Sequence, residues 1–217
     1  MRPDAMNPLE HDLQAINGDL VRMLSMVREG CALARQALVD QDMMAARRCI
    51  DGDDAIDRLQ ADLEMRILTV IARRQPAARD LRFLGGSLQA LADIERAGDY
   101  AEHVATAAMA LAEQPPLKKY LDLQRIFDVL SAMLDASAKA FAEADEDAAR
   151  RSHAMDSEID ALYDQIHREL LTYMIQDPTT INRANQLLSV ARYLERLGDH
   201  LENVDEHILF WLTGERI

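Results

Sequence analysis

Residues 95–104 read ERAGDYAEHV and residues 195–204 read ERLGDHLENV, so six of ten positions recur after one hundred residues. The recurring positions include two glutamates, an aspartate, an arginine and a glycine, whereas most apolar residues between them differ. Packing alone would tolerate other polar residues there, so the repeat indicates a duplicated chemical site. In a helix, acids at positions i, i+4 and i+7 share one face. A face with three carboxylates is suited to binding a cation.

The duplication extends upstream of this acidic motif. Asp53–Leu59 corresponds to Asp156–Leu162 at an offset of 103, and Pro76 corresponds to Pro178 at an offset of 102. The offset falls to 100 at the motif itself. These changes fall where loops are expected, because length changes are tolerated best in loops. The repeating unit is a module of about one hundred residues, close to the usual size of a domain.

Apolar residues recur at helical spacing in each unit, and no stretch alternates with the period of a strand. Asp42 is a suitable N-cap for the second helix, and Pro76 is acceptable in the first turn of the third. Pro115-Pro116 interrupts the chain, which predicts domains at 1–114 and 115–217. The predicted fold is all-α, with two tandem similar three-helix bundles of six long helices. These helices span residues 8–40, 43–75, 76–113, 118–144, 146–176 and 178–212.

Composition excludes some classes of protein. The longest stretches without Asp, Glu, Lys or Arg are far shorter than the ~20 residues of a membrane-spanning helix. No secretory signal is recognisable at the N-terminus, so a cytoplasmic protein is predicted. A net charge of -14 and a pI of about 4.8 argue against nucleic acid as a partner. Cys31 and Cys49 lack Cys-x-x-Cys spacing, and free thiols are expected.

The acids of each unit match in height along the predicted helices. Asp57 lies 19 residues before Pro76 and Glu95 lies 19 after it, while Asp53 and Asp99 lie 23 before and after. At ~1.5 Å rise per residue, an antiparallel helix pair brings the members of each pair level. Packed helices lie ~8 to 10 Å apart, close enough for the side chains to share an ion. The predicted metal ligands are Asp53, Asp57, Glu95 and Asp99 in the first unit and Asp156, Asp160, Glu195 and Asp199 in the second.

The repulsion between the carboxylates helps to decide between a metal site and a metal-free acidic face. Four carboxylates about 7 Å apart, at an effective dielectric near 20, repel by roughly 2.4 kcal/mol per pair. The total approaches the ~5 to 15 kcal/mol that stabilises a typical domain. Ion pairs with Arg58, Arg96 or Arg196 are the alternative, and they usually explain a single i, i+4 acid pair. The doubled motif and matched heights favour metal. Further candidate neighbours are Glu102, His103, Glu202, Asn203 and Glu206.

Oxygen ligands favour Mg, Ca, Mn or Fe over a structural zinc, which prefers Cys and His. His103 takes the place of Asn203 in the first motif, which would add a nitrogen donor and alter the metal preference. A surface role for this histidine is the alternative. The candidate ions are Fe, Mn, Mg, Zn and Ca. No Glu-x-x-His pattern is present, which counts against a ferritin-like di-iron oxidase.

These motifs resemble the PhoU family over essentially the whole chain. Each second helix carries D-x-x-I-D, and Gln75–Arg82 is similar to the family turn Q-P-x-A-x-D-L-R. The third helices resemble E-R-x-G-D-x-x-x-N, and Asn203–His207 resembles the closing N-I-x-E. The chain departs from the family pattern at His103 and in the second turn, Asp177–Thr180.

The resemblance implies two three-helix bundles side by side, with multinuclear iron or other divalent-metal clusters on the acidic motifs. It also implies a homodimeric cytoplasmic negative regulator of phosphate uptake and of the phosphate-starvation response. Its partners would be the ATPase of the phosphate ABC transporter and the phosphate sensor histidine kinase.

The residues themselves favour a protein that is not an enzyme. No nucleophile lies beside a base and no glycine-rich phosphate loop is present, and Gly85-Gly86 within the third helix indicates close packing. Two alternatives stay open, a carboxylate-bridged metalloenzyme and a metal-free structural adaptor.

Overall fold

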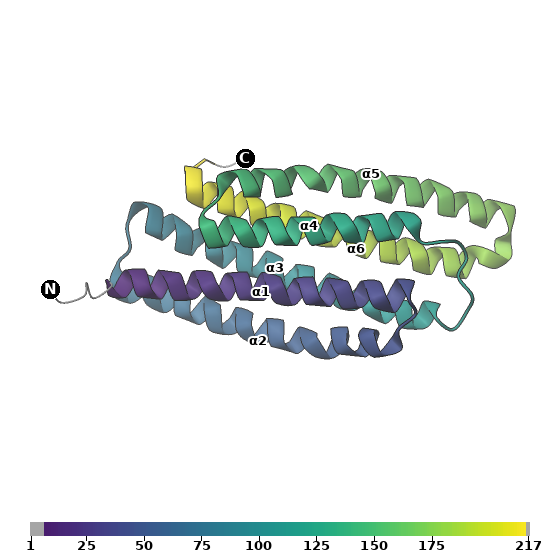
Figure 1. Cartoon of the computed structure of the whole chain (residues 1–217), viewed down its shortest axis with the longest axis horizontal. Coiled ribbons are helices and arrows are strands. Elements are labelled where there is room, and N and C mark those ends of the chain that lie inside the picture. The colour runs from purple at the N-terminus through teal and green to yellow at the C-terminus, as the bar shows by residue number, and fades with distance from the viewer. Residues whose placement is uncertain (1–6, 216–217) are drawn as a thin grey trace.

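The computed structural model describes residues 7–215, and within them the chain forms long helices and no strands (Figure 1). This confirms the predicted all-α fold of two repeated bundles. The elements are α1 Pro8–Val39, α2 Met43–Arg74, α3 Ala78–Leu111, α4 Leu121–Glu143, α5 Glu146–Gln176, the short 3-10 helix η1 Pro178–Thr180, and α6 Ile181–Thr213.

Helices α1 to α3 form one bundle, called unit one below, and α4 to α6 form unit two. The units lie side by side with their helices running along a common long axis (Figure 1). The most extensive contact between any two helices joins α3 of one unit to α6 of the other, and α1 also packs on α4. The units therefore share a continuous hydrophobic core. The boundary predicted near Pro115-Pro116 falls in the segment between α3 and α4 and stays a prediction.

The helix ends follow from local chemistry. The predicted N-cap of α2 is confirmed, because an Asp42 carboxylate oxygen accepts hydrogen bonds from the backbone N–H groups of Met44 and Ala45. The start of the third helix differs from the prediction. Pro76 lies in the connecting loop, and α3 begins at Ala78. Gln75 is the C-cap of α2 with φ 49°, so the chain turns in a left-handed conformation before the next helix starts.

Small residues let α3 approach α6 closely. A Cβ atom added to Gly86 would lie 3.0 Å from the backbone oxygen of His207, so the predicted packing role holds at this glycine. Gly85 has no such neighbour within 4 Å. At the same end of the interface the Phe83 and Trp211 ring centroids lie 4.8 Å apart. Their apolar area, taken out of water, stabilises the joint between the units.

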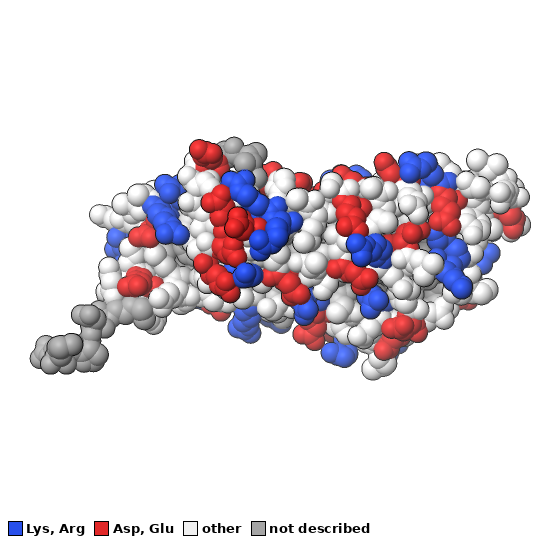
Figure 2. Space-filling view, turned by 45° about the horizontal axis from the view of Figure 1, so that its top comes forward, with Lys and Arg blue, Asp and Glu red and all other residues white. Residues whose placement is uncertain are grey.

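Among the described helices, none has the length and apolar character needed to cross a membrane. Figure 2 shows acidic and basic side chains interspersed over one face of the molecule, with a dense acidic group flanked by basic residues.

Candidate metal centres

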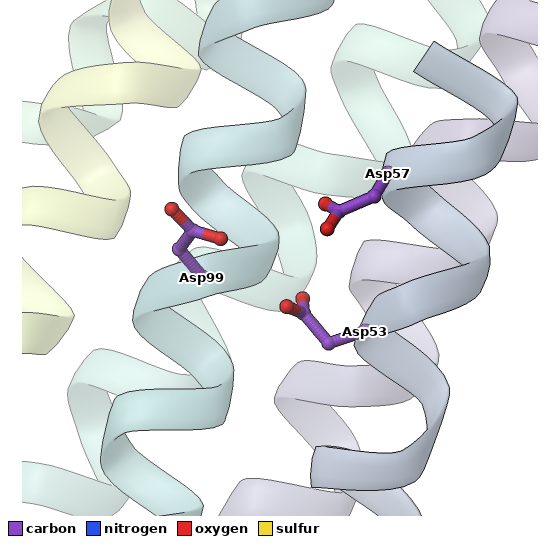
Figure 3. Close-up of side chains that lie close together, drawn as sticks. All are labelled: Asp53, Asp57 and Asp99. Atoms are coloured by element: carbon purple, nitrogen blue, oxygen red, sulfur yellow. The ribbon is translucent and has the colours of Figure 1, made fainter. Parts of the chain in front are cut away.

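Centre one lies between α2 and α3. One carboxylate oxygen from each of Asp53, Asp57 and Asp99 lies within 4.8 Å of the other two. Figure 3 shows Asp53 and Asp57 one turn apart on α2, extending toward Asp99 on α3. Ile56 lies between the two α2 acids in sequence and is buried in the core, so the acids stand at the edge of the helix contact. Residues 46 positions apart are thus joined into one group of acids.

Centre two repeats this arrangement between α5 and α6. Asp156, Asp160 and Asp199 each contribute a carboxylate oxygen to a group whose members lie within 4.8 Å of one another. Asp156 is only 6% exposed, and its buried Oδ1 has no hydrogen-bond partner within residues 7–215. Because buried polar atoms are rarely left unsatisfied, this oxygen fits the role of a ligand to a cation.

The glycine of each motif permits this close approach. A Cβ atom at Gly98 would lie 3.0 Å from Ile56 Cδ1 and 3.4 Å from Asp53 Oδ1. At Gly198 the corresponding distances are 2.9 Å to Ile159 Cδ1 and 2.7 Å to Asp156 Oδ1. Glycine is therefore repeated because a larger side chain would separate the paired helices and the acids that they carry.

The carboxylates destabilise one another where they meet. Burial raises the pKa of Asp53 to about 6, and the neighbouring charges of Asp99 and Asp57 add to this rise. In centre two, burial raises the pKa of Asp156 to about 7, with further contributions from Glu202 and Asp160. A bound cation would favour the ionised forms and reverse both shifts. The donor set, carboxylate oxygen from three side chains, fits a hard divalent cation.

The predicted ligands Glu95 and Glu195 stand outside the two three-carboxylate groups. Burial and then the charge of Asp99 raise the pKa of Glu95, so this side chain is close enough to sense centre one. Glu195 is 8% exposed, and its Oε1 lies 2.5 Å from an Arg192 nitrogen. Its buried Oε2 accepts no hydrogen bond from the described residues and lies 3.9 Å from Arg196 Nε, so Arg196 offsets part of the charge on this oxygen.

Arginines pair with one acid in each centre. Arg96 Nη1 lies 2.9 Å from Asp99 Oδ2, and Arg196 Nη1 lies 3.1 Å from Asp199 Oδ2. Arg58 instead approaches Asp54, at 4.0 Å and on the exposed surface. The predicted ion pairs of Arg96 and Arg196 are thus present, and they offset part of the acidic charge.

The other residues predicted to lie near the metal ions have different surroundings in the structure. Glu102 contributes to the raised pKa of Asp53 and accepts a hydrogen bond from Thr106. Glu202 and Glu206 lie 3.5 Å and 3.9 Å from His153 Nε2. His103 lies outside centre one. Its ring centroid is 5.2 Å from that of Tyr193 on α6, and its Nε2 is 3.9 Å from Glu102.

Asn203 belongs to a polar network that the sequence analysis missed. Asp93 on α3 meets His200 Nδ1 at 2.9 Å, His207 Nε2 at 3.1 Å and the Asn203 amide at 3.2 Å, all on α6. Burial alone would raise the pKa of Asp93, but these hydrogen bonds outweigh it and hold the pKa at about 2. Position 93 corresponds to Tyr193 in the repeat, so the duplication offers no signal for this acid.

Fold and site together define a class of protein: a duplicated three-helix bundle with one group of three carboxylates in each copy. The family model described as the PhoU domain matches residues 20–108 and 123–208, once in each unit. The chain belongs to the PhoU family.

Similar proteins cover nearly the whole chain. A phosphate-specific transport system accessory protein PhoU homolog of Deinococcus radiodurans is 42% identical over 96% of this chain and 98% of its own length. A homolog from Aquifex aeolicus with the same description is 39% identical over 94% and 92%. The crystal structure of PhoU from Pseudomonas aeruginosa superimposes with a TM-score of 0.91 at 32% identity, covering 94% of this chain and 99% of that one.

Proposed function

We propose that this protein is a regulatory accessory protein of the phosphate-specific transport system, and that its two acidic centres bind metal ions. The accessory role is supported by the descriptions of its full-length relatives. The metal-binding role is carried by one observation, the convergence of three carboxylate oxygens within 4.8 Å in each unit. The protein acts without catalysing a reaction, through protein contacts in the cytoplasm.

Each ion would be held by side chains from two helices. In centre one Asp53 and Asp57 hold it from α2 and Asp99 from α3, while Glu95 lies near enough to contribute. The ion supplies positive charge between acids that otherwise repel one another. The carboxylates then bind α2 to α3, and Asp156, Asp160 and Asp199 bind α5 to α6 in the same way.

Metal binding of this kind would set the shape of the protein's interaction surfaces. The proposed partners are the ATPase of the phosphate ABC transporter and the phosphate sensor histidine kinase, and the proposed assembly is a homodimer. Through these contacts the protein restrains phosphate uptake and the phosphate-starvation response. Fe, Mn, Mg, Ca and Zn are the candidate ions, and the oxygen-rich donor set supports the harder ones.

A metal-free adaptor is the second candidate, favoured by the ion pairs Arg96–Asp99 and Arg196–Asp199. In that case the acids serve helix-surface pairing, and the family's protein contacts need no ion. The two candidates differ in a measurable quantity, the amount of metal per chain in protein purified without a chelator.

Stability measurements test the metal-binding function directly. A cation that binds only the folded protein stabilises it by about 2.7 kcal/mol at one hundred times its dissociation constant. We expect chelation to lower the melting temperature. Asp99→Asn and Asp199→Asn should be less stable than the wild type with metal, but equally or more stable without it, because the apo carboxylates repel.

Asp54→Asn is the matched control, since Asp54 lies on α2 beside Asp53 with a side chain that is 83% exposed. It should leave metal content and the response to chelator unchanged. A melting temperature indifferent to chelator in the wild type, or an Asp99→Asn variant equally destabilised with and without metal, would favour the metal-free adaptor.

A further inference from the structure

A cavity unrelated to the acidic centres lies between the beginning of α1 and the end of α2. Its volume is about 360 Å³, and it shares no lining residue with the hollow beside Asp53. Three arginines and one aspartate line it, in a chain whose net charge is -14. The polar and flexible side chains of the lining include His11, Asp12, Met65, Arg66, Arg73 and Arg74.

Two of the arginines are held in place by carboxylates. Arg66 Nη1 lies 2.5 Å from Asp19 Oδ2 and 3.4 Å from Asp62 Oδ2, while Arg74 Nε lies 2.9 Å from Asp12 Oδ2. Each guanidinium uses only one nitrogen in these contacts, so its remaining N–H groups make no hydrogen bond to the described part of the chain. A guanidinium fixed on one side and free on the other is preorganised to bind an oxyanion.

The third arginine is uncompensated. Arg73 has no acidic partner among residues 7–215, and it lines the same cavity as Arg66 and Arg74. His11 adds another nitrogen at the wall. Arginine forks match the oxygen geometry of phosphate and bind it with two parallel hydrogen bonds.

The cavity belongs to unit one alone. The end of α5 corresponds to the end of α2. Its Glu169 and Gln176, with Asp177 directly after the helix, take the places of the three arginines. In addition α4 has 23 residues where α1 has 32, so unit two lacks the helical turns that form the other wall. The duplication and the acidic centres therefore do not explain these arginines.

We propose that this cavity binds a phosphate group, either as inorganic phosphate or as a phosphomonoester. The arginines contact the phosphate oxygens, and the buried side chains Ile16 and Val70 with Met65 offer an apolar surface to an attached organic group. The site lies apart from both acidic centres and its binding needs no metal there.

Isothermal titration of the full chain tests the proposal, after metal has been removed by chelation and the chelator dialysed away. Inorganic phosphate and phenyl phosphate are the probes, and sodium chloride holds the ionic strength constant. We expect one saturable site per chain. Tighter binding of phenyl phosphate identifies a phosphomonoester site, and equal or tighter binding of inorganic phosphate identifies a site for the free ion.

Three variants locate the site. Arg73→Gln should weaken binding about tenfold, the loss typical of a hydrogen bond to a charged group. Because Arg73 has no ion pair within the described chain, this variant should fold normally. Arg66→Lys keeps the charge beside Asp19 but loses the fork, and it should also weaken binding. Arg47→Gln is the matched control, since Arg47 is an exposed arginine at the other end of α2.

Two outcomes would overturn the phosphate-site proposal, and the first involves the control variant. Equal weakening by Arg47→Gln and Arg73→Gln would show only general attraction of anions to surface charge and would overturn the proposal. The absence of saturable binding by either probe would overturn it as well. Because every titration uses metal-free protein, such a failure leaves the metal-binding proposal untouched.

Discussion

The two acidic centres carry the same three aspartates in different surroundings. Asp53 is half-buried, whereas Asp156 is 6% exposed, and burial raises the pKa of Asp156 to about 7 against about 6 for Asp53. The motif glycine also lies closer to the facing acid in unit two, with a Cβ distance of 2.7 Å against 3.4 Å. The motif selects the ligands, but the approach of the facing helix sets how strongly they are desolvated.

The core beside the acidic centre is more polar and more tightly packed in unit two than in unit one. In unit two the buried Ser137, Ser152 and Asp205 form a hydrogen-bonded group, and Asp205 is 0% exposed. The repeat places Cys49 where unit two has Ser152, and the Cys49 thiol donates to a backbone carbonyl.

Unit one instead contains the hollow of about 420 Å³ beside Asp53, lined in part by Gly30 and Gly52. Unit two has Met133 and Met155 at the corresponding positions, and both pack into or against its core. Water therefore reaches centre one more easily than centre two, which explains the smaller effect of burial on Asp53.

The largest expected loss of stability comes from Asp93, an interface position where unit two has Tyr193. Asp93→Ala removes a half-buried carboxylate from three polar partners on α6 and should lower the free energy of unfolding by about 3 kcal/mol. Tyr193→Phe, at the corresponding position of unit two, is the control and should cost less. Urea denaturation at pH 7 measures both variants, and equal losses would contradict the asymmetry.

Acid titration gives a second measure of Asp93. Its folded pKa of about 2 lies below the ordinary value of 3.8, so its contribution is present above pH 3.8 and is lost as the pH falls toward 2. The Asp93→Ala variant should lack this part of the acid destabilisation.

The acidic centres should show the opposite pH dependence in metal-free protein. The folded pKa of Asp156 is raised above 3.8, so its protonated form stabilises the fold below pH 3.8, and this contribution is lost as the pH rises through about 7. Asp156→Asn should remove a pH-dependent loss of stability of about 4 kcal/mol, since each pKa unit corresponds to about 1.4 kcal/mol. Asp53→Asn should remove a smaller loss of stability, which in the wild type is complete near pH 6. Equal effects would contradict the difference in burial between the centres.

The motif glycines should give the smallest difference. Alanine favours a helix over glycine by about 1 kcal/mol, but overpacking a core costs about 1 to 3 kcal/mol. The closer contacts at Gly198 make Gly198→Ala destabilising, while Gly98→Ala should be nearly neutral. Chemical denaturation should separate the two variants by about 1 kcal/mol. A Gly98→Ala variant that is the less stable of the two would contradict the closer approach of the facing helix at Gly198.

Much of the fold could be predicted because the same pattern of helices and acidic motifs occurs twice in the sequence. Helical periodicity, the Asp42 cap and the proline breaks placed all six long helices to within a few residues. The equal spacing of acids about Pro76 predicted that Asp53 would lie level with Asp99 and Asp57 level with Glu95. Asp53 and Asp99 do lie together, although α3 begins at Ala78 and not at Pro76. Glu95 was grouped with them on spacing alone, but the direction of its side chain depends on Arg96 and on the packing around it.

The sequence by itself determined the duplication, the helical class and the pairing of acids within each unit, since periodicity and spacing are local properties of a chain. Only the tertiary structure decided how the units join. Asp93 meets His200 and His207 because α3 packs on α6, a contact between residues more than one hundred positions apart. The burial that separates Asp53 from Asp156 arises in the same way, from atoms that the motif does not contain.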